Sequence, residues 1–224
     1  MTIKSNQWII CELKYLSIAS SLLVISIFGD HLLSIKRTPV NSYVIALTDT
    51  LIHGMIASLS WLLVAVTKGQ PIYENIILIE SLLAFMTASA IDFDHVLEAR
   101  SFDLKIVSQL SDRPFLHNTS LMLSISLSII AIGLLRHNWL IHTYGWIFLT
   151  AIFTHHLRDA IRHGFWFYPF HTKPVPQWLY VLTLTSFPLI CSLLMNIVAK
   201  EWLERHSIND NIKYQAMDLN LEEV

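Results

Sequence analysis

The chain has 224 residues, of which 54% are hydrophobic and only 14% are charged, and its mean hydropathy is +0.51. Soluble domains carry about 25% charged residues, so this composition excludes an ordinary soluble globular protein and indicates an integral membrane protein. The formal net charge of −2 provides no broad basic surface, which argues against nucleic acid as a partner.

Apolar stretches long enough to cross a bilayer recur along the chain. Crossing the hydrocarbon core takes about 20 residues of helix, and a helix satisfies its own backbone hydrogen bonds in lipid. We therefore expect an all-α, polytopic, multi-pass membrane helix bundle of about six transmembrane helices. The predicted spans are residues 10–30, 44–66, 74–92, 118–137, 139–160 and 176–199.

The composition of the chain changes near residue 199. Residues 1–199 contain all the predicted spans, and we expect them to form one transmembrane helical bundle domain. Residues 200–224 contain six acidic and three basic residues, so we expect a polar C-terminal tail outside the bilayer, with the composition of a partly disordered segment.

The histidines are distributed unevenly between the two membrane faces. Six spans would place the first, third and fifth loops on one face, and eight of the eleven histidines lie on or toward that face. Aspartates accompany them at the same span ends. The eight are His31, His53, His95, His117, His155, His156, His163 and His171.

Two Asp–His pairs lie within or at the end of predicted spans. Asp49 and His53 are too deep in the second span to be loop residues. An ionised aspartate at the centre of a membrane helix costs about 2.5–3.5 kcal/mol, so it usually faces a bundle interior and has a partner. Both this pair and His155 with Asp159 are spaced i, i+4, which places each pair on one helical face. Such a pair could bind one ion or form a structural contact between helices.

The mixture of imidazole and carboxylate groups predicts a divalent metal site. Zinc is the metal most suited to these ligands, with manganese or iron as alternatives. The ligands are numerous enough for one ion, or for two ions about 3.5–4 Å apart that share a carboxylate. The predicted metal ligands are His53, Asp94, His95, His117, His155 and Asp159.

Other polar residues near these ligands have the chemistry for catalysis. We predict Asp92, Asp94 and Arg113 as catalytic residues, with either aspartate acting as ligand, bridge or general base. Arg113, Arg158 and Arg162 could hold an anionic substrate through paired hydrogen bonds, and phosphate is the natural choice.

The order of these motifs resembles that of a known family. His53 is followed by "DFDH" at 92–95, "DRPFLHNTS" at 112–120 and "HHLRDAIRHGFWFYPF" at 155–170. This pattern is similar to the LexA-binding, inner membrane-associated hydrolases, which are described as metal-dependent. The resemblance implies functional roles for the matching residues: His53, Asp92, Asp94, His95, Arg113, His117, His155 and Asp159, with Gly164, Pro169 and Phe170.

A closer resemblance links three segments to the transmembrane protein 267 family. These segments are "LSDRPFLH" at 110–117, "HHLRDAIRHG" at 155–164 and "PQWLYV" at 176–181. The length of the chain and the layout of its spans also fit that family. The resemblance implies a eukaryotic membrane protein and brings no assigned activity with it.

The chain departs from the hydrolase pattern beside His117. Where that family has His, Gly, Thr and Ser, this chain has Asp112, Pro114, Leu116 and Asn118. Aspartate can still bind a metal, but loss of the two hydroxyl groups removes hydrogen bonds around the ligands or the substrate. Two functions therefore remain open. One is a metal-dependent hydrolase of a phospholipid or another phosphoester; the other is a non-catalytic pseudoenzyme, scaffold or transporter-like bundle that retains the polar core.

Overall fold

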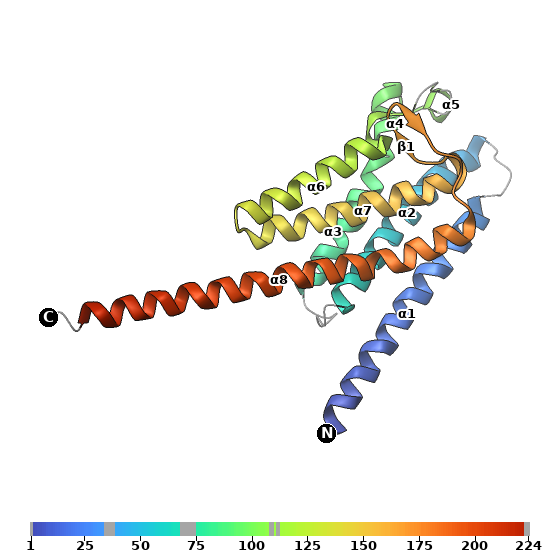
Figure 1. Ribbon diagram of the computed structural model, residues 1–224. Helices are drawn as coiled ribbons and strands as arrows, with labels where there is room; N and C mark the ends of the chain where they lie inside the picture. Colours follow the sequence, from blue (N-terminus) through green and yellow to red (C-terminus); the bar gives the residue numbers. More distant parts are fainter. Residues whose placement is uncertain (1, 34–38, 68–74, 108–109, 111–112, 222–224) are drawn as a thin grey trace.

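The computed structural model describes residues 2–33, 39–67, 75–107, 110 and 113–221, and these residues are mostly helical (Figure 1). The all-α prediction is confirmed, with one small β-hairpin in addition. The elements in chain order are α1 (Thr2–Leu33), α2 (Pro39–Thr67), α3 (Asn75–Ile91), α4 (Phe93–Ala99), α5 (Leu104–Val107), the 3-10 helix η1 (Phe115–His117), α6 (Thr119–Leu135), α7 (Trp139–His163), β1 (Trp166–Phe167), β2 (Phe170–His171) and α8 (Gln177–Leu221).

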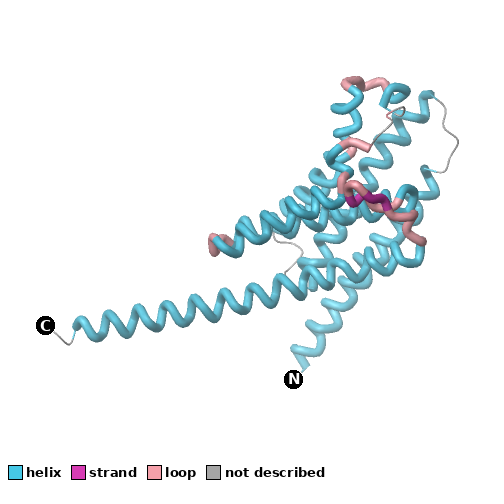
Figure 2. Tube along the Cα trace, turned by 45° about the horizontal axis from the view of Figure 1, so that its top comes forward, coloured by secondary structure: helices cyan, strands magenta, loops and turns pink. Residues whose placement is uncertain are grey.

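The bundle is built around α7. This helix packs against α2, α3, α6 and α8, and most of its residues are buried. The N-terminal end of α1 and the C-terminal end of α8 extend away from the other helices (Figures 1 and 2). At the opposite end, α4, α5 and the β-hairpin gather beyond the ends of the long helices. The side chains on α7 are therefore the ones best placed to contact several helices at once.

Four helices in the described part of the chain are long and apolar enough to cross a membrane. They are Glu12–Gly29, Tyr43–Thr67, Asn75–Ala99 and Gln177–Trp202, and they match four of the predicted spans. α6 is apolar but shorter, and α7 is not among the candidates. α7 carries several histidines and charged groups, which lower its hydropathy although it lies inside the bundle. The chain is a multi-pass integral membrane protein.

Small residues allow the helices to approach one another closely. A Cβ atom added at Gly54 would lie 2.4 Å from Ser89 Oγ, so α3 packs tightly on α2 immediately after His53. A Cβ atom at Gly145 would lie 2.8 Å from the backbone nitrogen of Ile130, which brings α6 equally close to α7. Close packing of this kind is a main source of stability for helices in lipid.

Asparagine side chains fix the starts of α6 and α7. Asn118 accepts a hydrogen bond from the backbone nitrogen of Leu121 at 3.1 Å, and Asn138 accepts one from Ile141 at 3.1 Å. Both are N-caps, which satisfy backbone donors that the first helical turn leaves free. Because Asn118 follows His117 directly, the cap also fixes the position of that histidine at the entrance to α6.

The structure adds elements that the sequence analysis did not assign. The third predicted loop contains α4, α5 and η1, and residues 166–171 form the β-hairpin. α7 ends at Gly164, whose φ of +74° is disfavoured for other residues, and an added Cβ there would lie 2.1 Å from Thr172 O. α8 continues to Leu221. Its side chains after Trp202 are not described, so the division into a bundle and a tail at residue 199 stays a prediction.

Candidate metal centre

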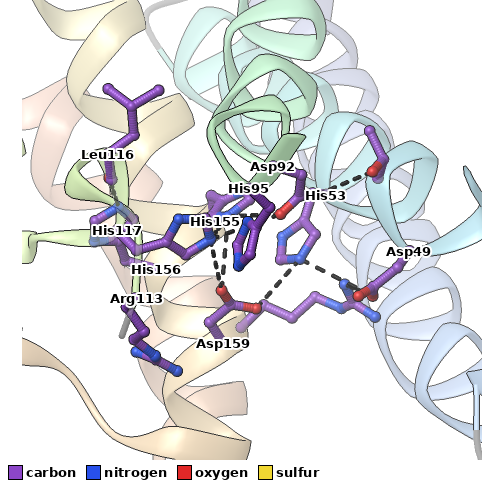
Figure 3. Close-up of polar contacts among 12 residues, drawn as sticks. Asp49, His53, Asp92, His95, Arg113, Leu116, His117, His155, His156 and Asp159 are labelled. Carbon is purple, nitrogen blue, oxygen red and sulfur yellow. Dashed lines mark hydrogen bonds and ion pairs between the residues drawn. The ribbon is translucent and has the colours of Figure 1, made fainter. Parts of the chain in front are cut away.

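Side chains from separate parts of the chain meet in one cluster (Figure 3). His53 comes from α2, Asp92 from the junction of α3 and α4, and His117 from η1. α7 contributes His155 and Asp159, one helical turn apart. The sequence predicted Asp92 as a catalytic residue and the other four as metal ligands, and the structure brings all five together.

The Nε2 atoms of two histidines lie close to each other and to one oxygen from each of two aspartates. The Nε2 atoms of His117 and His155 lie 3.5 Å apart. His117 Nε2 lies 3.7 Å from Asp92 Oδ1 and 3.4 Å from Asp159 Oδ2, and His155 Nε2 lies 3.5 and 3.7 Å from the same oxygens. Ligands about 2.0–2.2 Å from a tetrahedral ion are about 3.3–3.6 Å apart. These buried His and Asp groups could therefore hold a metal ion.

The histidines and the two carboxylates differ in their access to solvent. The side chains of His53, His117 and His155 are at most 4% exposed. Asp92 and Asp159 are 24% and 16% exposed. A small ligand would therefore enter past the carboxylates, while the histidines form the buried wall of the site.

Asp94 lies behind His117 rather than beside the four facing atoms. Its Oδ2 atom accepts a hydrogen bond from Leu116 N at 2.9 Å and lies 3.2 Å from His117 Nδ1. A carboxylate in this position fixes the orientation of a ligand histidine and increases its basicity. The opposite oxygen, Oδ1, lies 3.1 Å from Nδ1 of the partly exposed His95. Asp94, His95 and His117 form a further group that could hold an ion.

The carboxylates around His117 change its protonation. Burial alone would lower the pKa of His117, but its contacts with Asp159, Asp92 and Asp94 raise that pKa to about 11. η1 lies outside the candidate membrane spans. Because a histidine must lose its proton to bind a metal, a cation has to displace that proton at neutral pH. The site therefore attracts positive charge, whether from a proton or from a metal ion.

Asp49 is held by arginines on α7. Its Oδ1 atom accepts a hydrogen bond from Arg158 Nη1 at 2.6 Å, and Arg162 Nη1 lies 3.4 Å from its Oδ2 atom. His53 Nε2 is 4.0 Å from Asp49 Oδ1. Asp49 therefore supplies the counter-charge that the buried guanidinium of Arg158 needs, and the binding of an anionic substrate by Arg158 and Arg162 stays a prediction.

Arg113 remains beside the cluster and is half-buried. Nη1 donates a hydrogen bond to Gly164 O at 3.4 Å, and the side chain lies on the Asp159 side of the site in Figure 3. Burial lowers the pKa of Arg113, and the negative charge of Asp159 opposes that shift. Its neighbour Asp112, which replaces a histidine of the hydrolase pattern, lies outside the described residues.

Two residues near the cluster were not predicted. Thr50 Oγ1 donates to Asp92 Oδ2 at 3.0 Å and so turns the other oxygen of Asp92 toward the histidines. The ring of His156 contacts Thr119 Oγ1 at 2.9 Å and Leu116 O at 3.0 Å, which fastens η1 to α7. Thr50 is three residues before His53, so its position on the same helical face was a usable signal. His156 has Ala160 four residues later and so lacks the aspartate spacing that marked His155.

Fold and site together define a multi-pass α-helical membrane protein with a buried His/Asp cluster. Transmembrane protein 267 of Mus musculus is 34% identical over 189 residues, which cover 83% of this chain and 85% of that relative. The Bos taurus protein of the same name is 35% identical over 171 residues, or 75% and 76% of the two chains, and that of Danio rerio is 34% identical over 172 residues, or 75% and 74%. The chain belongs to the transmembrane protein 267 family, as its motifs predicted.

Two further comparisons gave no match. No family model matches the sequence, so the resemblance to the LexA-binding hydrolases depends on the motifs alone. No solved structure matches the chain.

Proposed function

We propose that this protein is a membrane-embedded, metal-dependent hydrolase that acts on a phospholipid or another phosphoester at headgroup depth. The main support is that His117 Nε2 and His155 Nε2 lie 3.4–3.7 Å from each other, from Asp92 Oδ1 and from Asp159 Oδ2. Two imidazole nitrogens and two carboxylate oxygens suit zinc best, and manganese or iron can bind the same set. When bound, such an ion supplies Lewis-acid catalysis and makes water a better nucleophile near neutral pH.

The surrounding residues have separate roles in this proposal. Asp94 orients His117, which refines its expected role as a direct ligand and as a catalytic residue. Asp92 is the more exposed carboxylate, so it is available both as ligand and as general base. Arg113 can present its guanidinium N–H groups to phosphate oxygens, which suit paired hydrogen bonds. His95 lies at the exposed edge of the cluster, where it is available as a further ligand.

The proposal also places all six long helices across the bilayer. α6 has 17 residues, so it is about 26 Å long, slightly less than the hydrocarbon thickness of about 30 Å. Local thinning of the bilayer accommodates a mismatch of this size at modest cost. α7 is shielded from lipid by the helices packed around it, which explains how it tolerates its polar side chains.

Metal analysis of the purified protein tests the proposal. The detergent-solubilised wild type is expected to contain zinc, manganese or iron at about one equivalent or more, measured by mass spectrometry. His155→Ala and Asp159→Ala should lose this metal, because each removes an atom that faces the other ligands. His171→Ala is the matched control, since His171 is exposed on β2. A wild type without metal, even after incubation with each ion, would count against the enzyme.

A non-catalytic polar core is the second candidate. The hydrogen bond from Thr50 to Asp92 and that from Arg158 to Asp49 both join different helices, so polar groups here also hold the bundle together. Hydrolysis assays separate the two functions. A protein that contains metal but hydrolyses neither p-nitrophenyl phosphate nor short-chain phospholipids would favour the structural role.

A further inference from the structure

We infer that the centre binds two metal ions, with Asp159 as the bridging carboxylate and His53 as the ligand that belongs to the second ion alone. This inference rests on the proposed function, because it concerns the same group of side chains. It adds the number of ions and assigns different ligands to each.

The first observation is that the two oxygens of Asp159 face different histidines. Oδ2 lies 3.4 Å from His117 Nε2 and 3.7 Å from His155 Nε2, whereas Oδ1 lies 3.4 Å from His53 Nε2. Figure 3 shows these contacts leaving the carboxylate in two directions. A carboxylate that turns one oxygen to each of two ligand sets is arranged as a bridge between two ions.

The second observation is that the buried ring of His53 makes no hydrogen bond with the described residues, and that Nε2 is held by an ion-pair contact with Asp159 Oδ1 at 3.4 Å. The residue is 1% exposed. A buried polar atom without a partner costs about 1–3 kcal/mol. His53 Nε2 points at Asp159 Oδ1, so an ion bound between these two atoms would remove part of that cost.

The third observation is the stacking of His53 on His155. Their ring centroids are 3.8 Å apart and their planes differ by 25°. A histidine nitrogen binds a metal in the plane of its ring. The rings of His53 and His155 are nearly parallel and both Nε2 atoms face Asp159. Each ring would therefore bind an ion in its own plane, and the two ions would lie at neighbouring points. The separation of the rings matches the distance of about 3.5–4 Å between the ions of two-metal sites.

The fourth observation concerns the difference between the two ions. Asp92, His117 and His155 are available to the ion on the Oδ2 side of Asp159. On the Oδ1 side, the described residues offer Asp49 as a further carboxylate, but it lies 4.0 Å from His53 Nε2 and is already bound by Arg158. Among the described residues the second ion therefore has fewer ligands, and we expect it to bind more weakly and to exchange faster.

Reloading with manganese tests this inference. The purified full-length protein is stripped of metal with a chelator, titrated with Mn²⁺, and examined by equilibrium dialysis and electron paramagnetic resonance. The wild type should bind about two equivalents in two steps and give the spectrum of a spin-coupled manganese pair. His53→Ala should bind about one equivalent and give an uncoupled spectrum, while His171→Ala should match the wild type.

Each outcome has a distinct meaning. A wild type that saturates at one equivalent with an uncoupled spectrum overturns the two-ion inference but leaves the proposed hydrolase intact. A wild type that binds no ion overturns both. If His53→Ala fails to fold, as judged by size-exclusion chromatography, His53→Gln replaces it as a more conservative variant. The number of ions in the wild type decides the question in either case. Coupled ions that persist in a folded His53 variant would also overturn the assignment of His53.

Discussion

The two ends of α7 each contain a fully buried histidine, but in different chemical surroundings. His142 accepts a hydrogen bond from the indole nitrogen of Trp146 at 3.1 Å, and its ring packs near Trp139 and Trp202. His155, at the other end, faces carboxylate oxygens and further imidazoles. Both are 0% exposed, so burial does not distinguish a packed histidine from a candidate ligand. The groups that face the ring do.

Replacing one histidine by alanine at each end of α7 should give the largest difference in metal binding between the two ends. His117→Ala is expected to reduce metal affinity at least about 100-fold, because it removes a ligand from the facing group. His142→Ala should leave metal content unchanged and lower stability by about 1–3 kcal/mol, through loss of the partner of a buried indole. Metal analysis and thermal unfolding in detergent provide the two readings. Equal metal loss in both variants would end the contrast.

Asp94→Asn should sharpen the comparison, because it changes the carboxylate that lies behind His117 at the His/Asp end. We expect metal affinity to fall about 10–100-fold, with the fold retained, because an amide orients His117 less strongly and makes it less basic. Competition with a fluorescent zinc chelator measures the change. An affinity equal to that of the wild type would mean that Asp94 does not support the site.

The metal affinity of the His/Asp end should also depend on pH. The pKa of His117 is about 11 in the metal-free fold and about 6.5 in an unfolded chain. Protonation of His117 therefore stabilises the metal-free fold fully below about pH 6.5, and this contribution is lost as the pH rises toward 11. A metal must displace the proton, so apparent metal affinity should rise about tenfold per unit between about pH 6 and 8. Calorimetric titration at several pH values measures the slope, and a flat profile would contradict it.

The smallest effect is expected from Thr50→Val. This change keeps the shape of the side chain but removes the hydrogen bond to Asp92 Oδ2, so the carboxylate gains rotational freedom. We expect metal affinity to fall by about threefold to tenfold, less than for Asp94→Asn, because Asp92 keeps its charge and position. Thr67→Val is a matched control, since Thr67 donates its hydrogen bond to Leu63 O at the far end of α2, 14 residues along the helix from His53. Identical affinities in the two variants would show that Thr50 is only a packing residue.

Hydropathy and spacing were sufficient to predict much of the bundle. The long apolar stretches gave four spans directly, because crossing lipid imposes a length that composition reveals. The short elements between α3 and α6 were not predicted, since their positions depend on tertiary hydrogen bonds such as that from Leu116 N to Asp94. The same limit applies to the β-hairpin.

Residue type and depth identified the members of the cluster but not their arrangement. His53 and Asp159 were recognisable because polar groups within apolar spans need partners. The placement of Asp94 behind His117 was not predictable, because sequence spacing cannot show which carboxylate contacts Nδ1 of the ring and which contacts Nε2. The pairing of Arg158 with Asp49 depends likewise on the relative rotation of α2 and α7.

The composition of α7 also has a consequence for biosynthesis. In the six-span arrangement proposed above, α7 carries Arg158, Asp159 and several imidazoles across the bilayer, so a translocon would integrate it poorly on its own. Its counter-charge Asp49 and its companion His117 are translated earlier, on α2 and η1. Integration of α7 should therefore depend on helices that were translated earlier and are already inserted in the membrane. The same polar side chains that form the cluster would then also determine the order in which the helices assemble.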